Sequence, residues 1–237
     1  MALGSNLRNK LGYYFIEISI ISIGITISFS VQTYLNKLDN KEKQIEAYER
    51  ILVDLERDRV YFNQAYDNNE LQIQSSKEIV SGYLTQENFN RIITYYGTFF
   101  NDNTIASIKS TGLLEDFDNK TLINDLLTYY RQDYDFLTDA VEWDEKIALE
   151  NILLVAREVE IDSISTNNSL RHTNKTKTAL YFIGDKSIES LKLNSNFIGL
   201  LHSKIWAKFV YNNFLSNALI RNQDIAKRIE KELHLLQ

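Results

Sequence analysis

The sequence predicts an all-α protein: an N-terminal transmembrane helix continuous with a long coiled-coil-like helix, packed in an antiparallel helical bundle. Three observations favour this fold. The 237 residues include no proline, the residue most hostile to helix interiors. One apolar run near the N-terminus is long enough to cross a bilayer. Over most of the remaining chain, apolar residues recur at helical spacing.

The apolar run covers residues 11–35 and carries one formal charge, Glu17. Roughly 20 apolar helical residues cross a hydrocarbon layer, and Tyr13, Tyr14 and Tyr34 mark the two ends, where aromatic rings prefer the headgroup region. Isoleucine alternates with Ser or Thr here, which also fits a strand. However, strands are usually 3–10 residues long, whereas a helix satisfies its own backbone in lipid.

A cleaved signal peptide is the alternative, because Arg8 and Lys10 precede the run and residues 28–30 resemble a small-x-small cleavage site. The run exceeds the usual 7–15 residues of such peptides and contains a carboxylate. We therefore expect a tail at 1–10, a span at 11–35 and a domain at 36–237. The basic tail predicts a cytoplasmic N-terminus, although lysines also follow the span. The acidic remainder is then extracytoplasmic.

Two polar stripes run along the predicted span. Glu17, Ile21, Gly24, Ser28 and Gln32 share one side, while Ser19, Ser22, Thr26, Ser30 and Thr33 share roughly the opposite side. Small and hydroxyl residues favour close helix packing in lipid, so the stripes predict contact with other membrane helices. Alternatively, the hydroxyls bond to their own helix. For Glu17, an interhelical bond, snorkelling to the interface and ion coupling remain open.

Beyond the span, the apolar pattern continues without a breaker to Ile73, and Gly82 marks the first turn. The spacing then predicts helices over 89–100, 105–111, 119–159 and 196–235, the last returning antiparallel to the first. Gly112 has the position of a helix C′ glycine. Residues 162–177 are rich in Ser, Thr and Asn and predict an exposed loop.

Two segments resemble an uncharacterised family of bacterial single-span membrane proteins, a domain of unknown function. One is Ile16, Glu17, Ile18 followed by Ile23, Gly24, Ile25, although the family commonly has Gly where Ile16 stands. The other runs from Ile108, Lys109, Ser110, Thr111, Gly112 to Leu126, Leu127, Thr128, Tyr129, Tyr130. The resemblance implies a membrane anchor with a helical extracytoplasmic domain, hence the bacterial inner membrane and the periplasm, and no assigned activity.

No constellation of residues predicts catalysis. The chain has no Cys, its three histidines are far apart, and phosphate-binding or nucleophile motifs are absent. We therefore expect no metal and no cofactor. The pairs Asp116–Asp118 and Asp133–Asp135 are interpreted as solvated surface, and the aromatic runs 95–100 and 129–136 as core rather than a ligand groove. A net charge of −6 disfavours nucleic acid as a partner.

These observations predict a structural or interaction protein and not an enzyme. The expected partners are the lipid bilayer and either further copies of the chain or other membrane subunits, with the protein an accessory subunit of a cell-envelope complex. The alternative is a stator-like or transport-coupled component in which Glu17 takes part in ion movement. A ligand sensor would need an output domain, which ten residues before the span do not supply.

Overall fold

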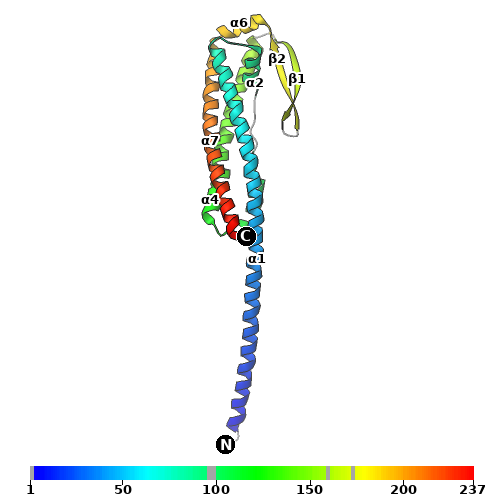
Figure 1. Ribbon diagram of the computed structural model, residues 1–237, viewed down its shortest axis with the longest axis vertical. Helices are drawn as coiled ribbons and strands as arrows, with labels where there is room; N and C mark the ends of the chain where they lie inside the picture. The colour runs from blue at the N-terminus through cyan, green and yellow to red at the C-terminus, as the bar shows by residue number, and fades with distance from the viewer. Residues whose placement is uncertain (1–2, 95–99, 159–160, 172–173) are drawn as a thin grey trace.

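In the computed structural model, one helix of 78 residues, α1 (Leu3–Val80), forms the axis of the molecule. The structure describes residues 3–94, 100–158, 161–171 and 174–237. Of the described residues within 3–14, 161–182 and 185–186, it describes the backbone alone. The N-terminal half of α1 projects alone, and the other half lies in a helical bundle (Figure 1). The single helix spanning both parts confirms that the apolar run continues into the bundle without a break.

The bundle half of α1 is buried along one heptad seam. Eleven positions at alternating spacings of four and three are all buried: Gln44, Tyr48, Ile51, Leu55, Asp58, Phe62, Ala65, Asn69, Gln72, Ser76 and Ile79. Such spacing keeps one face toward its neighbours along the whole helix. The neighbours are helices of the same chain, foremost α7 (Ser195–Leu236). The apolar pattern that the sequence predicts along this helix includes Tyr48, Leu55 and Phe62 of the observed seam.

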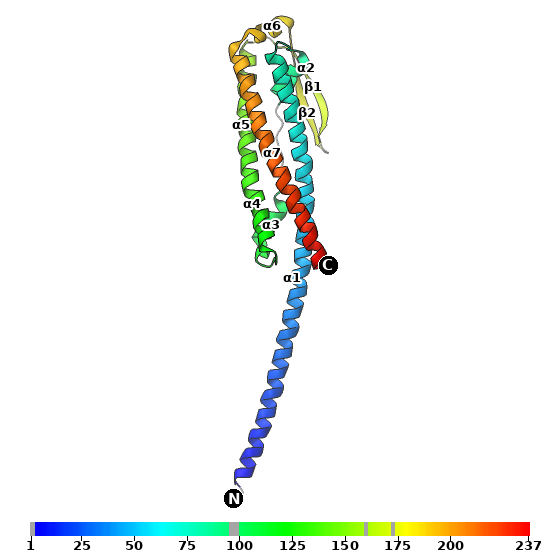
Figure 2. The same cartoon turned by 60° about the vertical axis from the view of Figure 1, so that its left-hand side comes forward.

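Shorter elements connect the two long helices. They are α2 (Gln86–Ile93), α3 (Asn103–Thr111), the 3-10 turn η1 (Leu113–Glu115), α4 (Lys120–Thr128), the π-helical turn η2 (Tyr129–Asp133), α5 (Tyr134–Glu158), β1 (Ile161–Arg171), β2 (Asn174–Ile183) and α6 (Asp185–Leu193). Together α4, η2 and α5 make the predicted long helix of 119–159. Helix α7 runs antiparallel to α1 and packs against it, and α5 packs against α7 (Figures 1 and 2). The antiparallel helical bundle is therefore confirmed.

Most of the apolar core lies where α1, α5 and α7 meet. One cluster centres on Tyr48, Phe62, Tyr129 and Leu215, and a second, at the far end from the projecting helix, centres on Phe89 and Phe197. These side chains are at most 1% exposed. Because large apolar side chains stabilise by about 1.5–3 kcal/mol each when fully buried, the bundle is a complete core without help from the projecting half of α1.

Two glycines end helices as the sequence predicts. Gly82 has φ 94°, and the amide of Tyr83 donates to the carbonyl of Glu78 while that of Gly82 donates to Ile79. This is the Schellman arrangement that closes a helix C-terminus. Gly112, with φ 74°, ends α3 in the same left-handed conformation. Substitution at either position would strain the backbone, because L side chains disfavour positive φ.

Two predictions about local structure are wrong, and one helix was not predicted. Within the predicted loop, the described residues 162–171 and 174–177 are not a loop: they belong to the antiparallel strands β1 and β2, which pair in register from Ser163 with Phe182 to Arg171 with Asn174. Thr and Ser suit strands as well as loops when two segments can pair, and polar composition alone does not separate the cases. The helix predicted over 89–100 ends earlier: α2 stops at Ile93, and Thr94 is extended. Residues 95–99 of that prediction lie outside the described part of the chain. Helix α6 was not predicted.

Candidate functional site

The projecting half of α1 is the most exposed apolar surface in the described chain. All thirteen large apolar residues from Phe15 to Leu38 are more than 40% exposed. The helix is long and apolar enough to cross a membrane, and none of its most apolar stretch is buried in the protein. A helix of a soluble core would be covered by its own protein, so this exposure favours either a membrane span or a signal sequence.

Within the projecting helix, hydroxyl groups bond to the carbonyls four residues earlier. Ser19 donates to Phe15, Thr26 to Ser22 and Ser28 to Gly24, at 2.8–2.9 Å. Each hydroxyl proton is therefore engaged locally, and the oxygen retains its acceptor capacity. Apart from its chain neighbours and the adjacent backbone of its own helix, no described atom lies within 4 Å of where a Cβ would stand at Gly24. The two stripes, with Glu17 and Ile21 on one and Ser22 on the other, stay a prediction about helix contacts.

A buried polar cluster forms around Asp58 on the seam of α1. Its Oδ2 accepts from the hydroxyls of Tyr129, at 2.8 Å, and Tyr134, and its Oδ1 accepts from the backbone and side-chain amides of Asn101. Asn222 of α7 donates to the Tyr129 hydroxyl at 3.1 Å. Burial raises the pKa of Asp58, and these donors partly oppose the shift. The cluster therefore joins α1, α7 and the turn η2.

The π-helical turn η2 explains how two tyrosines reach one carboxylate. Residues five apart in an α-helix point about 140° away from each other, because each residue turns 100°. In a π-turn the hydrogen bonds run over five residues instead of four, so Tyr129 and Tyr134 lie one turn apart on the same side. Tyr130, the other tyrosine of the predicted structural motif, is also buried and packs edge-on against Tyr129.

A second buried cluster contains two lysines and one acid. Lys208 of α7 donates to Asp144 of α5 at 2.6 Å and to Asn69 of α1 at 2.8 Å, and all three side chains are at most 1% exposed. Lys204, one turn earlier, is also fully buried, and no described group hydrogen-bonds to its Nζ. Burial lowers the pKa of Lys208, and it lowers that of Lys204 to about 8.

We expect Lys204→Met to stabilise the domain, because methionine keeps the volume and removes an unpaired buried charge. A gain of about 2 kcal/mol corresponds to a rise in Tm of about 4–8 °C for a chain of this size. Between pH 8 and 10.5 the unfolded lysine holds a proton that the folded one releases, so wild-type stability rises with pH. The gain should therefore be largest below pH 8 and vanish near pH 10.5.

Thermal unfolding of the detergent-solubilised full-length chain, followed by circular dichroism at pH 7 and pH 10, measures this difference. Lys227→Met is the matched control, since Lys227 is an exposed lysine of the same helix, and we expect it to change Tm by less than about 1 °C. An equal gain for Lys204→Met at both pH values would show that the lysine is not a buried charge.

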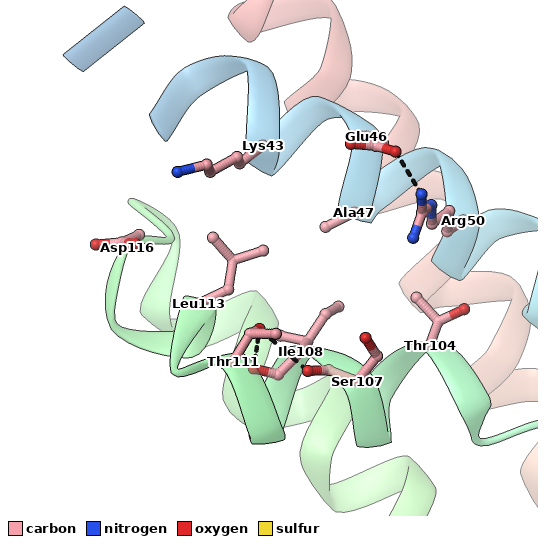
Figure 3. Close-up of a pocket in the computed structure, with 10 residues that line it drawn as sticks. All are labelled: Lys43, Glu46, Ala47, Arg50, Thr104, Ser107, Ile108, Thr111, Leu113 and Asp116. Atoms are coloured by element: carbon pink, nitrogen blue, oxygen red, sulfur yellow. Dashed lines mark hydrogen bonds and ion pairs between the residues drawn. The ribbon is translucent and has the colours of Figure 1, made fainter. Parts of the chain in front are cut away.

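A groove of about 310 Å³ opens between α1 and α3, near the base of the bundle. Ala47, Ile108 and Leu113 form its floor, and Lys43 and Asp116 face each other across its mouth (Figure 3). Arg50 forms an ion pair with Glu46, and Lys43 forms one with Asp39. The hydrogen bond from Lys43 to Asp39 raises the pKa of Lys43. With its cations already paired on the surface, the groove has no convergent set of free polar groups.

The structure confirms the interpretation of some of the remaining predicted residues and contradicts that of others. Ser110 is exposed and donates to the carbonyl of Ser107, so it is part of a helix end rather than a site. Asp116, Asp118 and Asp135 are exposed, as the interpretation of solvated surface requires. For Asp133 that interpretation is wrong: the residue is 8% exposed and lies 3.1 Å from Arg221 of α7. A distant basic partner gave no signal in the sequence.

Among the described residues, no group of three or more His, Cys, Asp or Glu side chains is arranged to hold a metal ion. Comparisons with protein-family models, curated proteins and solved structures found no match to this chain. The resemblance to a single-span family therefore stays a prediction. The function has to be inferred from the exposed helix, the two buried polar clusters and the surface of the bundle.

Proposed function

We propose that this protein is a membrane-anchored structural or interaction protein, whose projecting helix spans a bilayer and holds the helical bundle outside the cytoplasm. In this role the protein associates with itself or serves as an accessory subunit of a cell-envelope complex. The observation that carries the proposal is the stretch from Phe15 to Leu38, in which every large apolar side chain is exposed and uncovered by the rest of the protein. Lipid is the environment that satisfies such a surface.

The bundle supports the second half of the proposal. Its polar interior residues bind each other across helices, as Asp58 does with Tyr129 and Lys208 with Asp144. Because the first pair connects α1 to the turn η2 and the second connects α7 to α5, while Lys208 also reaches Asn69 of α1, these bonds hold the helices in one register. Because α1 is one continuous helix, it would hold the bundle at a fixed position relative to the membrane. Such a rigid body on an anchor suits an assembly function better than a reaction.

We expect the full-length protein to remain with the membrane pellet after alkaline carbonate extraction. Ile21→Arg combined with Ile25→Arg should release most of it, because each arginine near the bilayer centre costs about 2.5–3.5 kcal/mol on insertion scales. Leu149→Arg with Leu153→Arg is the matched control, since these leucines are 55% and 47% exposed on α5. The control should stay in the pellet. Wild-type protein recovered free in solution, beginning after Ser30, would instead identify a signal peptide.

The stator-like alternative depends on Glu17 alone. Its side chain is exposed on the projecting helix, and no other described side chain hydrogen-bonds to it. Ion movement through a membrane requires a path of polar groups, and only one carboxylate is present on this span. We therefore place the structural function first.

A further inference from the structure

Charge is distributed very unevenly along α7. Over residues 195–220 the only acidic or basic residues besides His202 are Lys204 and Lys208, and both are buried. The next twelve residues, 221–232, include seven charged ones. The outward face of the first 26 residues of α7 therefore carries no Lys, Arg, Asp or Glu, whereas the end of the same helix has the charged surface usual for a solvated helix.

Aromatic and amide side chains occupy that face instead. Trp206, Phe209 and Ile220 are 59%, 53% and 68% exposed, and the rings of Trp206 and Phe209 stack with centroids 6.0 Å apart. Asn213 and Asn217 lie between them and are exposed. At 100° per residue these five side chains fall on one side of α7, opposite its buried residues. We call them the α7 face.

The neighbouring helix α5 extends this surface. Its Phe136, 49% exposed, stacks on Phe214 of α7 at 5.4 Å. Trp143, 39% exposed, stands two turns further along the same side of α5, and its neighbour Asp144 contacts α7 through Lys208. Exposed apolar surfaces of this extent mark interaction sites. Aromatic enrichment and loss of charge are the composition of interface centres.

We propose that the α7 face binds the α7 face of a second copy of this chain, forming a two-fold dimer whose axis runs along the membrane normal. The orientation rests on the proposed function, because the anchor holds every copy at one height with its bundle pointing the same way. A two-fold axis then brings each level of α7 against the same level of the partner. Trp206 and Phe209 meet their counterparts, and so does Ile220.

Two copies of the α7 face can contact each other without repulsion between like charges. In a symmetric contact any charged residue near the axis meets its own copy, which costs energy; the α7 face avoids this by having no Lys, Arg, Asp or Glu. Asn213 and Asn217 have amides that both donate and accept hydrogen bonds, so each can pair with the same residue of the partner. A partner of another kind would generally be recognised through complementary charge.

The area is also sufficient. The outward side of residues 195–220, which includes the α7 face and carries no Lys, Arg, Asp or Glu, covers 26 helical residues and extends about 39 Å at 1.5 Å per residue. With a width of roughly 15–20 Å, which is one helix with its side chains and the flanking rings of α5, the strip offers about 600–800 Å² per copy. Standard stable interfaces bury about 800 Å² per partner, and the smaller specific ones about 600 Å².

The absence of cysteine from the chain makes cross-linking a direct test. Asn213→Cys and Asn217→Cys, each introduced into the full-length protein in native membranes, should give disulfide-linked dimers on mild oxidation, because a disulfide requires Cα atoms within about 7 Å. Glu142→Cys and Glu145→Cys, exposed positions of α5 that do not share the side of Phe136 and Trp143, should give none. Absence of dimers from both Asn variants, or equal amounts from the controls, would overturn the proposal.

Phe209→Glu tests the same face without oxidation. Two carboxylates would meet at the centre of the dimer, and we expect the dissociation constant in detergent, measured by light scattering, to rise about tenfold or more. Phe209 is exposed, so the fold should survive, which circular dichroism verifies. Dimers that persist in this variant would place self-association in the span instead, and co-purification of a different protein lost on Phe209→Glu would assign the face to that protein.

Carbonate extraction of the same membranes separates the two proposals. Protein that stays in the pellet without cross-linking at Asn213 or Asn217 rejects the dimer and leaves the anchor intact. Protein released from the membrane rejects the anchor, and with it the shared height on which the symmetric contact depends.

Discussion

Asp144→Asn is expected to destabilise the bundle by about 3–4 kcal/mol at pH 7. The carboxylate of Asp144 is the acidic partner of Lys208, 2.6 Å away, and both side chains are at most 1% exposed. Asparagine keeps the shape and removes the charge, which leaves Lys208 and Lys204 buried without an anion. Breaking one partner of a buried pair costs about 3–5 kcal/mol, because the remaining charge is desolvated and uncompensated.

The pH dependence gives this loss a signature. Without Asp144, the pKa of Lys208 in the folded state falls further below its ordinary value of 10.5, since burial already lowers it and the carboxylate opposed that shift. The unfolded chain then binds more protons than the folded chain between the two values, so stability of the variant rises with pH. We expect the difference from wild type to shrink between pH 7 and pH 10.

Denaturant unfolding of the full-length protein in detergent measures both effects. The chain has two tryptophans, Trp143 and Trp206, and their fluorescence reports on α5 and α7, the helices that the pair connects. The double variant Asp144→Leu with Lys208→Met should recover much of the loss, since the charge of Lys208 is removed together with that of its partner and only Lys204 stays buried. A loss of less than about 1 kcal/mol for Asp144→Asn, or no recovery in the double variant, would show that the pair is open to solvent.

The sequence predicted the long elements and missed what holds them in register. Helix α1, the helix over 119–159 and α7 follow from apolar periodicity and from the glycines at 82 and 112. The seam of α1 was only partly predicted, because it includes Gln44, Asp58 and Asn69, which a search for apolar repeats passes over. Each finds its partner more than 40 residues away, and single-sequence patterns contain no information about such pairs.

The candidate site shows the same division. The apolar run predicted the long N-terminal helix, and helical spacing of its residues predicted the two polar stripes. It did not predict the α7 face, because lysines at 204 and 208 give the sequence of α7 an ordinary charged appearance. Only burial shows that both point inward. The π-turn was also missed: Tyr129 and Tyr134 would lie on different sides of a regular helix, so their shared acceptor is visible only in three dimensions.

Asp58→Ala is expected to cost about 3–5 kcal/mol. The side chain is fully buried and accepts four hydrogen bonds, two from tyrosine hydroxyls and two from Asn101. Alanine leaves these donors without their acceptor, at about 1–3 kcal/mol for each buried group that cannot find another partner, and opens a small cavity as well. Tyr134→Phe removes the donor to Asp58 and an acceptor of the Asn101 amide, which keeps its bond to Asp58, so we expect it to cost about 1–2 kcal/mol.

Asp58→Asn tests how the carboxyl group titrates. Burial raises its pKa in the folded state, so the contribution of Asp58 to stability is fully present below its ordinary pKa of 3.8 and declines as pH rises through the folded value. Asparagine has no such dependence. The stability difference between wild type and Asp58→Asn, measured by thermal unfolding of the full-length protein, should therefore widen from pH 7 toward pH 4. A difference that narrows over this range would mean that the four donors outweigh burial and that the cluster holds an ionised carboxylate.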